Sequence, residues 1–280
     1  MFYHKLNPFA IRNILTDRYY LGPPSVYHTM TIQRSGIQLH PLTTSDGSAI
    51  YTPPSRSSTL LAGINYPLEV PYRSNEIPED TYIEVNLRPN NAVGMVKERH
   101  IESLVKRVLQ SVILGEETPR CMLQCTIQVT DTQIDESLPG GVKSGGQGES
   151  YLETLASAVN VAVLGCLDAG VQMLGIAGAV VVSISRDGKI KTWPSLKERK
   201  AAESLHVFVF GKDGQNLLFE SEGRFEMEQW EAAEDAAKAV VVGRAQQDED
   251  VTMEEDRESL FATMRHAVED KVEREGRWRG

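Results

Sequence analysis

The segment that most constrains the fold is the apolar stretch LETLASAVNVAVLGCLDAG, residues 152–170. Its composition and its closing glycine predict a helix over residues 150–169 that ends at Gly170. The first turn is its most polar part, where Ser150, Glu153 and Thr154 can cap the helix and complement its dipole. We therefore expect this helix to be buried in the core of a domain.

A glycine-rich run, SGGQG at residues 144–148, leads directly into this helix. Glycine-rich turns at helix N-termini often hold phosphate, because free backbone N–H groups and the helix dipole favour an anion. The alternative interpretation is a flexible loop that only connects to the buried helix. The residues of the first helical turn, considered below, favour the loop.

Apolar periodicity before this helix predicts strands and one further helix. Alternating segments around an SDG turn at 45–47, a strand at 59–70 and another at 80–89 are interpreted as a three-stranded meander. A segment with helical spacing follows, and its apolar positions are Ile101, Leu104, Val105, Val108, Leu109 and Val112.

Further strands surround the buried helix in the sequence. Residues 120–130 alternate as a strand, and two hairpins are predicted around the turns RDG at 186–188 and KDG at 212–214. Another helix begins near Glu226. The predicted order is three strands, helix, strand, helix, four strands, helix. This is an α+β domain, too mixed for a doubly wound nucleotide-binding fold.

Composition divides the chain into an N-terminal extension over 1–36, a domain over 37–243, and an acidic linker with a C-terminal amphipathic helix over 244–280. Residues 246–256 are rich in Asp and Glu, so we expect a solvated linker. Two roles are open for the C-terminal helix, packing back onto the domain or docking onto a partner. Its apolar face comprises Leu260, Phe261, Met264, Val268 and Val272.

The formal net charge of the chain is −10. Residues 226–280 hold sixteen acidic and eight basic residues and so contribute −8, which leaves residues 1–225 near neutral at −2. Domains that bind nucleic acid usually carry a basic field over one whole face. This chain is therefore expected to contact nucleic acid only through a local basic patch or as one wall of a larger assembly.

Neither membrane insertion nor secretion is expected, because the chain has no run of about 18 apolar residues and its start lacks a signal-peptide pattern. The three cysteines, Cys121, Cys125 and Cys166, lie in apolar runs. We interpret them as buried, reduced thiols of a nuclear or cytosolic protein, and we expect no metal and no cofactor.

Four segments, taken in order, resemble the RNase PH family. They are the Asp-Gly-Ser turn at 46–48 with the strand that ends in Tyr66-Pro67, the stretch LRPNNAVGMVKERHIESLVKRVLQSVI, the helix closing in LDAG, and DGQNLLFESEGRFEMEQWEAAEDAA. The resemblance covers about residues 37–243 and is greatest to the ring subunits of the eukaryotic RNA exosome. It implies a two-layer α+β fold with a mixed sheet and helices around a ribosomal-protein-type βαβ core. It also implies dimers that close into six-membered rings, with RNA threaded through the middle.

Active members of this family cleave RNA with inorganic phosphate, and the resemblance places their Gly-Thr-Arg-Thr motif on residues 153–156. Here Leu155 replaces the arginine, and Glu153 stands two positions before it. A carboxylate about 4 Å from phosphate repels it by several kcal/mol. The first long helix keeps one family arginine as Arg107, but the next such position is Gln110. We therefore expect apolar and negative groups where a guanidinium is needed.

The family's two aspartates, which bind a metal ion or transfer a proton, are also missing. The inner one corresponds to Ala202, with Glu203 beside it as a displaced substitute. Near the outer position, Glu198 is flanked by Lys197 and Arg199. We expect these cations to pair with Glu198 and to leave it a poor metal ligand. The resemblance thus implies a degenerate catalytic site.

One group of cations is the best candidate for RNA contact. Singly, each would be solvated or paired with Glu98 or Glu102. The family's equivalent loop faces the central channel, however, and contacts to RNA phosphates need only charge and reach. The group comprises Arg88, Lys97, Arg99, Lys106 and Arg107, of which Lys97, Arg99, Arg107 and Arg88 are the predicted RNA-binding residues.

These features predict a non-catalytic structural subunit of the RNA exosome core ring. It would pair with other RNase PH-like subunits and line the RNA channel for 3'-to-5' RNA processing and degradation, including rRNA maturation and RNA surveillance. Cap subunits, an associated catalytic nuclease and RNA are the other partners implied, in nucleus, nucleolus and cytoplasm. Two alternatives are open: an active phosphorolytic exoribonuclease that uses Glu203 and Arg107, and an unrelated small-molecule enzyme on the same scaffold.

Overall fold

The computed structural model of the chain describes residues 35–91, 93–133, 149–243 and 259–277. These residues belong to one compact unit, Gln33–Gly280. The glycine-rich run at 144–148 and the acidic linker at 246–256 lie outside the described residues, as does nearly all of the predicted N-terminal extension.

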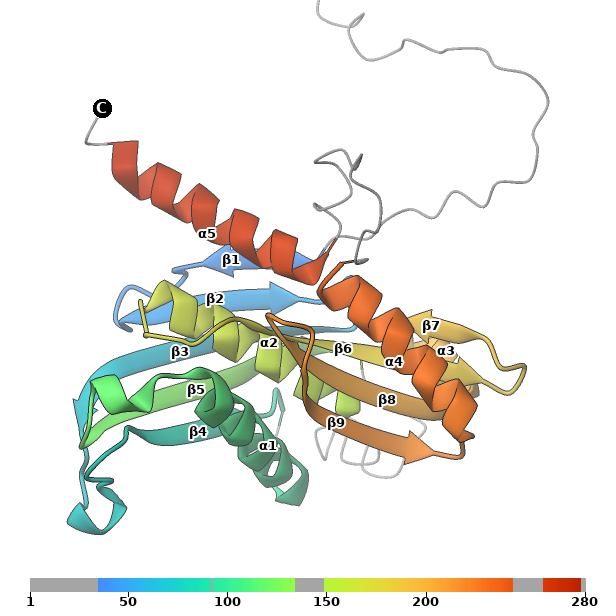
Figure 1. Ribbon diagram of the computed structural model, residues 1–280, viewed down its shortest axis with the longest axis horizontal. Helices are drawn as coiled ribbons and strands as arrows, with labels where there is room; N and C mark the ends of the chain where they lie inside the picture. The colour runs from blue at the N-terminus through green and yellow to red at the C-terminus, as the bar shows by residue number, and fades with distance from the viewer. Residues whose placement is uncertain (1–34, 92, 134–148, 244–258, 278–280) are drawn as a thin grey trace, which may run out of the picture. The chain divides into compact units, whose positions relative to one another are not determined.

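Five strands form a mixed sheet in the order β1-β2-β3-β5-β4 (Figure 1). Strand β4 runs parallel to β5, and all other neighbours in this sheet are antiparallel. Its members are β1 (Gly36–Leu39), β2 (Gly47–Thr52), β3 (Ser58–Glu69), β4 (Tyr82–Arg88) and β5 (Cys121–Thr132).

The predicted three-stranded meander is wrong in its strand count, because four strands (β1 to β4) precede the first long helix, and wrong at its last strand, because β4 does not pair with β3. Strand β5 lies between them, so β4 forms the edge of the sheet. A parallel pair needs a crossover connection, and helix α1 (Val96–Val112) supplies it. All six apolar positions predicted for this helix are buried. The β4–α1–β5 unit is the βαβ element that the resemblance implied.

A second sheet is antiparallel, with the order β7-β6-β8-β9. It contains both hairpins that the RDG and KDG turns predicted. Its strands are β6 (Ala177–Ser185), β7 (Ile190–Thr192), β8 (Ala202–Gly211) and β9 (Asn216–Gly223). A short helix that was not predicted, α3 (Leu196–Ala201), connects β7 to β8. This helix turns out to contribute to the candidate site.

Helix α2 (Leu152–Asp168) contacts both sheets, through β2 and β3 of the first and β6 and β8 of the second (Figure 1). This double contact explains its composition, since every residue from Leu152 to Cys166 except Thr154 is buried. Asn160 is polar and fully buried, but its amide is satisfied at both ends. Its Nδ2 donates to the Ala179 carbonyl at 2.9 Å, and its Oδ1 accepts from the Ala179 N–H at 2.8 Å.

The Asp-Gly-Ser turn and the end of α2 are in direct contact. A side chain at Gly47 would place its Cβ 2.3 Å from the backbone nitrogen of Ala169, so only glycine fits there. The Ser48 N–H donates to Oδ2 of the buried Asp168 carboxylate at 2.8 Å. Two motifs that are distant in the sequence thus fix the first hairpin against α2.

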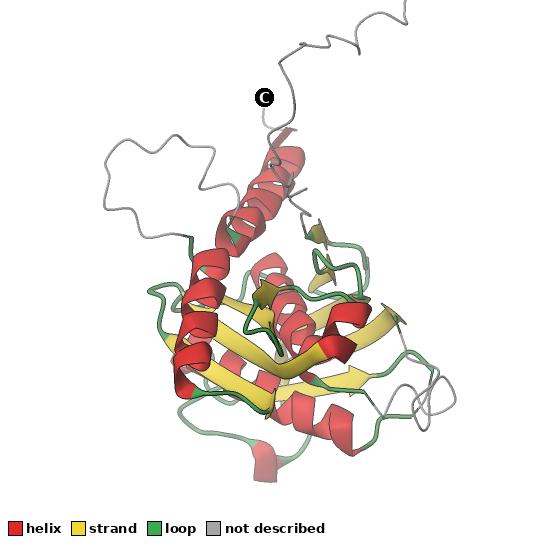
Figure 2. Cartoon of the chain, turned by 90° about the vertical axis from the view of Figure 1, so that its right-hand side faces the viewer, coloured by secondary structure: helices red, strands yellow, loops and turns green. Residues whose placement is uncertain are grey.

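Two helices complete the described chain, α4 (Met227–Val241) and α5 (Leu260–Gly276). Helix α4 contacts β6, β7 and β8, so that helices surround the strands on more than one side (Figure 2). Helix α5 contacts β1, α2 and α4 and buries Leu260, Phe261 and Met264. The C-terminal helix therefore packs back onto the domain, while Val272 is 62% exposed. No helix in the described part of the chain is long and apolar enough to span a membrane.

Candidate functional site

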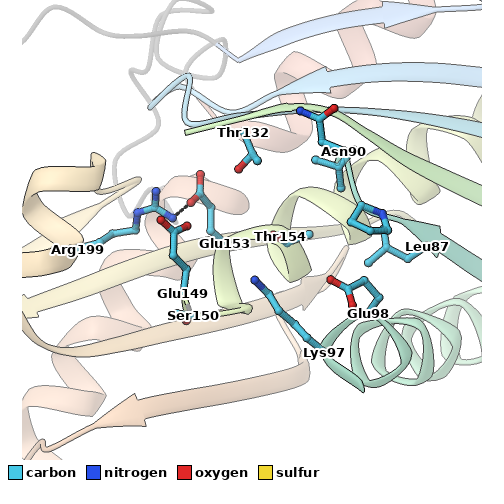
Figure 3. Close-up of a pocket in the computed structure, with 12 residues that line it drawn as sticks. Leu87, Asn90, Lys97, Glu98, Thr132, Glu149, Ser150, Glu153, Thr154 and Arg199 are labelled. Atoms are coloured by element: carbon cyan, nitrogen blue, oxygen red, sulfur yellow. Dashed lines mark ion pairs between the residues drawn. The ribbon is translucent and has the colours of Figure 1, made fainter. Parts of the chain in front are cut away.

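A pocket forms where the N-terminal end of α2 meets the start of α1, the ends of β4 and β5, and helix α3 (Figure 3). It contains residues 153 and 154, where the family resemblance places the phosphate-binding motif. Five of its lining side chains are charged: Lys97, Glu98, Glu149, Glu153 and Arg199. Two cations and three carboxylates give a formal charge of −1, so these groups together do not attract an anion.

An ion pair between Glu153 of α2 and Arg199 of α3 dominates the pocket (Figure 3). Nη1 of Arg199 contacts Oε2 of Glu153, and each side chain is only 9% exposed. Burial lowers the pKa of Arg199, against the opposing effect of the Glu149 carboxylate. Among the described residues, Nε and Nη2 of Arg199 and Oε1 of Glu153 have no hydrogen-bond partner. The pair is therefore desolvated and only partly satisfied.

Lys97 reaches the same pocket from α1 (Figure 3). Burial lowers its pKa, while the carboxylates of Glu98 and Glu149 raise it and Arg199 lowers it further. Lys97 is thus part of a charged cluster inside the pocket, which distinguishes it from the other three predicted RNA-binding residues.

The expectation that the phosphate position lacks a guanidinium is wrong, because Arg199 supplies one from a different element. Leu155, which stands at the family's arginine position, is fully buried in the hydrophobic core and does not line the pocket. Glu153 faces the pocket. Oγ of Ser150 accepts the Leu152 N–H at 3.2 Å, but the N-cap residue of α2 is Tyr151, which makes no side-chain cap hydrogen bond.

The expected pairing of Glu198 with Lys197 and Arg199 is also wrong. Adjacent residues on a helix point in different directions, so Arg199 turns to Glu153 while Glu198 faces the other way. The Glu198 carboxylate contacts Lys191 and accepts hydrogen bonds from Ser195 at the start of α3. Burial raises the pKa of Glu198, but the bonds from Lys191 and Ser195 outweigh it and hold the pKa below its usual value.

The positions of the family's aspartates hold no cluster of carboxylates. Ala202 begins β8, and Glu203 is exposed outside the pocket. In the described ranges no group of three or more His, Cys, Asp or Glu side chains could hold a metal ion. Cys125 and Cys166 are buried, and burial raises the pKa of the Cys166 thiol to about 12. Cys121 differs from the prediction, since it is partly exposed.

The other predicted RNA-binding residues lie on the surface of α1 and at the end of β4. Arg88, Arg99 and Arg107 are all exposed. Nη1 of Arg99 lies 3.0 Å from Oε2 of Glu102, whose Oε1 accepts the Leu87 N–H at 2.8 Å. Glu102 therefore links Arg99 to the strand end that carries Arg88. Separately, Nζ of Lys106 lies 4.7 Å from the ring centroid of Tyr82.

No family model matches the chain. Exosome complex component RRP46 of Saccharomyces cerevisiae is 26% identical over 191 residues, which are 66% of this chain and 79% of that protein. Exosome complex component rrp46 of Schizosaccharomyces pombe is 29% identical over 139 residues, which are 50% of this chain and 53% of that protein.

Two solved structures share the fold. Rice (Oryza sativa) Rrp46 has a TM-score of 0.61 at 20% identity and covers 74% of this chain and 88% of its own. A chain of the Archaeoglobus fulgidus exosome with RNA bound to the active site has a TM-score of 0.56 at 13% identity. The match covers 74% of this chain and 84% of that one. Both confirm the predicted RNase PH-like α+β fold.

Within the exosome ring subunits, the stretch RVLQSVILGEETPRCMLQCTIQV most resembles the ribosomal RNA-processing protein 46 type. The two curated relatives carry that name, so this narrower interpretation is confirmed as well. The chain has the RNase PH-like fold of exosome core subunits, and in sequence it is similar to exosome components of the Rrp46 type.

Proposed function

We propose that the chain is a non-catalytic structural subunit of an RNA exosome core ring. It pairs with other RNase PH-like subunits and lines the RNA channel for 3'-to-5' RNA processing and degradation, including rRNA maturation and RNA surveillance. Cap subunits and an associated catalytic nuclease complete the assembly, which acts in the nucleus, the nucleolus and the cytoplasm. Sequence similarity to Rrp46 components and the shared fold support this proposal.

The observation that carries the loss of activity is the buried Glu153–Arg199 pair. Phosphorolysis needs cations that are free to hold the attacking phosphate and to stabilise developing charge. Here the pocket's guanidinium already contacts an internal carboxylate, and Leu155 lies in the core. Ala202 offers no carboxylate for a metal or a proton. These side chains do not meet the chemical needs of the reaction.

We propose that RNA contacts this chain through Arg88, Arg99 and Arg107, with Lys97 nearer the pocket. The three arginines are exposed, and α1 positions two of them about two turns apart on one helix. Guanidinium groups bind the phosphate backbone without reading the base sequence. The expected contact is therefore independent of sequence, and it weakens as the salt concentration rises.

A second surface suits a protein partner. Strand β9 is an edge of the four-stranded sheet, and Phe219 on it is 58% exposed. Phe225 and Met227, which follow β9 in the chain, are 42% and 64% exposed. Edge strands with exposed apolar side chains are typical of protein interfaces. We propose that another RNase PH-like subunit covers this surface, and that the isolated chain is poorly soluble.

Activity is tested by incubating the purified chain with single-stranded RNA, inorganic phosphate and magnesium. We expect no release of nucleoside diphosphates, while an active enzyme of the same family releases them under the same conditions. Sustained release that Arg107→Ala abolishes would instead establish the active exoribonuclease. Native mass spectrometry tests the assembly, because a chain recovered from its source only as a monomer is not a ring subunit.

A further inference from the structure

The pocket at the start of α2 holds the components of an oxyanion site. A helix of 17 residues presents its N-terminal end there, with the partial positive charge of its backbone N–H groups. Arg199 lies beside it with a side chain that is 9% exposed. Within the described residues its Nε and Nη2 have no acceptor. A guanidinium with free N–H donors is suited to bind phosphate through two hydrogen bonds.

One carboxylate occupies the place that such an anion would take. Glu153 lies in the first turn of α2, where the helix dipole favours negative charge, and its Oε2 contacts Nη1 of Arg199. Figure 3 shows the two side chains facing each other across the pocket, with Glu149 next to them. Glu153 therefore makes the contacts that a bound oxyanion would make.

We infer that Glu153 is an internal counter-ion that excludes free oxyanions from a site formed by Arg199 and the N-terminal end of α2. The inference deepens the proposed function and rests on it, because it assumes that the unsubstituted chain does not use phosphate. It names the residue that blocks this site. It also makes a prediction that loss of activity alone does not make, namely that one substitution restores anion binding.

The physical reason is a direct competition for one guanidinium. A second anion about 4 Å from the Glu153 carboxylate meets a repulsion of several kcal/mol at the partly screened dielectric of such a pocket. Replacing the carboxylate with an amide of similar size removes this repulsion. It also removes the carboxylate that contacts the buried Arg199 guanidinium, which favours the entry of another anion although the Glu149 carboxylate still acts on Arg199.

The experiment compares Glu153→Gln with the unsubstituted full-length chain, using inorganic phosphate as the probe. Binding is measured by isothermal titration, and thermal unfolding is followed in phosphate and in chloride at equal ionic strength. Glu149→Gln is the matched control, because it removes the same charge from the same pocket and keeps the Glu153–Arg199 pair. Glu153→Gln combined with Arg199→Gln tests whether Arg199 holds the anion.

We expect Glu153→Gln to bind phosphate at least about tenfold more tightly than the unsubstituted chain, since tenfold corresponds to only about 1.4 kcal/mol. Its unfolding temperature should rise in phosphate by about 2–4 °C or more. Glu149→Gln and the double variant should show neither effect. Glu153→Ser provides a second variant if the glutamine variant does not fold.

Two results would overturn the inference. One is a folded Glu153→Gln variant that binds phosphate no better than the unsubstituted chain, and the other is equal binding by Glu149→Gln. Neither result bears on the proposed function, which fails separately if the unsubstituted chain releases nucleoside diphosphates. An RNase PH-like scaffold that stays inactive while Glu153→Gln binds phosphate supports both proposals.

Discussion

His206 is a fully buried base on β8 whose two ring nitrogens are both used. Nε2 lies 2.9 Å from Oγ of Ser204, and Nδ1 lies 2.8 Å from Oγ of Ser221. The ring of Phe225 packs edge-on at 4.7 Å between centroids. Burial in these surroundings lowers the pKa of His206 to about 4, from its usual 6.5. The folded chain therefore keeps this ring neutral at physiological pH.

This residue predicts how stability depends on pH. Between pH 6.5 and about 4 the unfolded chain binds a proton at His206 and the folded chain does not. The contribution of neutral His206 to the free energy of unfolding is therefore fully present above that range. It decreases as the pH drops through the range, by up to about 3 kcal/mol in total. His206→Gln should have a much flatter profile in urea unfolding between pH 7 and pH 4. His266→Gln, at an exposed position of α5, is the control. Equal pH slopes in wild type and His206→Gln would contradict the assignment.

The sequence predicts Glu153 as a residue of the site but not Arg199. Glu153 belongs to a long helix that is predicted from its apolar composition. The family motif at the end of this helix sets the alignment that places Glu153 at the site. Arg199 lies on a helix of six residues that buries no apolar side chain, so no apolar periodicity reveals it. Its neighbours in sequence suggest local pairing with Glu198, whereas helical geometry turns the two side chains apart. The pair between Arg199 and Glu153 exists only once α2 and α3 are packed together.

Helix α5 packs on the domain through apolar side chains in its N-terminal half and through one charged side chain, Lys271, in its C-terminal half. Met264 is fully buried, while Val272 on the same helix is 62% exposed. The helix also fits closely at Gly178, where a Cβ would lie 2.9 Å from the Phe261 ring. Nζ of Lys271 lies 2.6 Å from the buried Asp168 carboxylate, so a charge contact adds to the apolar ones.

We therefore expect Met264→Ala to lower the free energy of unfolding by about 2–4 kcal/mol, the usual cost of a large truncation in a packed core. Val272→Ala should change it by less than about 0.5 kcal/mol, because surface substitutions rarely matter more. Chemical denaturation of both variants measures the difference. Similar values for the two would mean that α5 does not pack on the domain in solution.

At the scale of elements, local sequence patterns predict which segments form helices and strands better than they predict which strands pair. Turn residues and alternation are sufficient for both hairpins of the second sheet. Helical spacing is sufficient for α1, and apolar composition with a closing glycine is sufficient for α2. The partner of β4 could not be predicted in this way, because β5 follows it only after the whole of α1. A strand that pairs with a later neighbour carries the same alternation as one that pairs with an earlier neighbour.

For the whole molecule, the proposed ring role requires a surface that a partner covers. Phe219 is exposed on the edge strand β9, and its ring packs edge-on against Trp230 at 5.6 Å between centroids. Both rings thus lie at one surface of the four-stranded sheet. A charge introduced there should disrupt binding to a partner far more than folding, because Phe219 contributes little to the core.

We expect Phe219→Asp to reduce recovery of a co-expressed RNase PH-like partner at least about tenfold, since burying an unpaired charge in an interface costs several kcal/mol. Val272→Asp is the control, because it adds the same charge at an exposed site on α5. Affinity co-purification measures the recovery, and thermal unfolding verifies that both variants are folded. Full recovery with Phe219→Asp would remove β9 from the proposed interface, because a partner packed on that strand cannot accommodate a carboxylate against its apolar side chains.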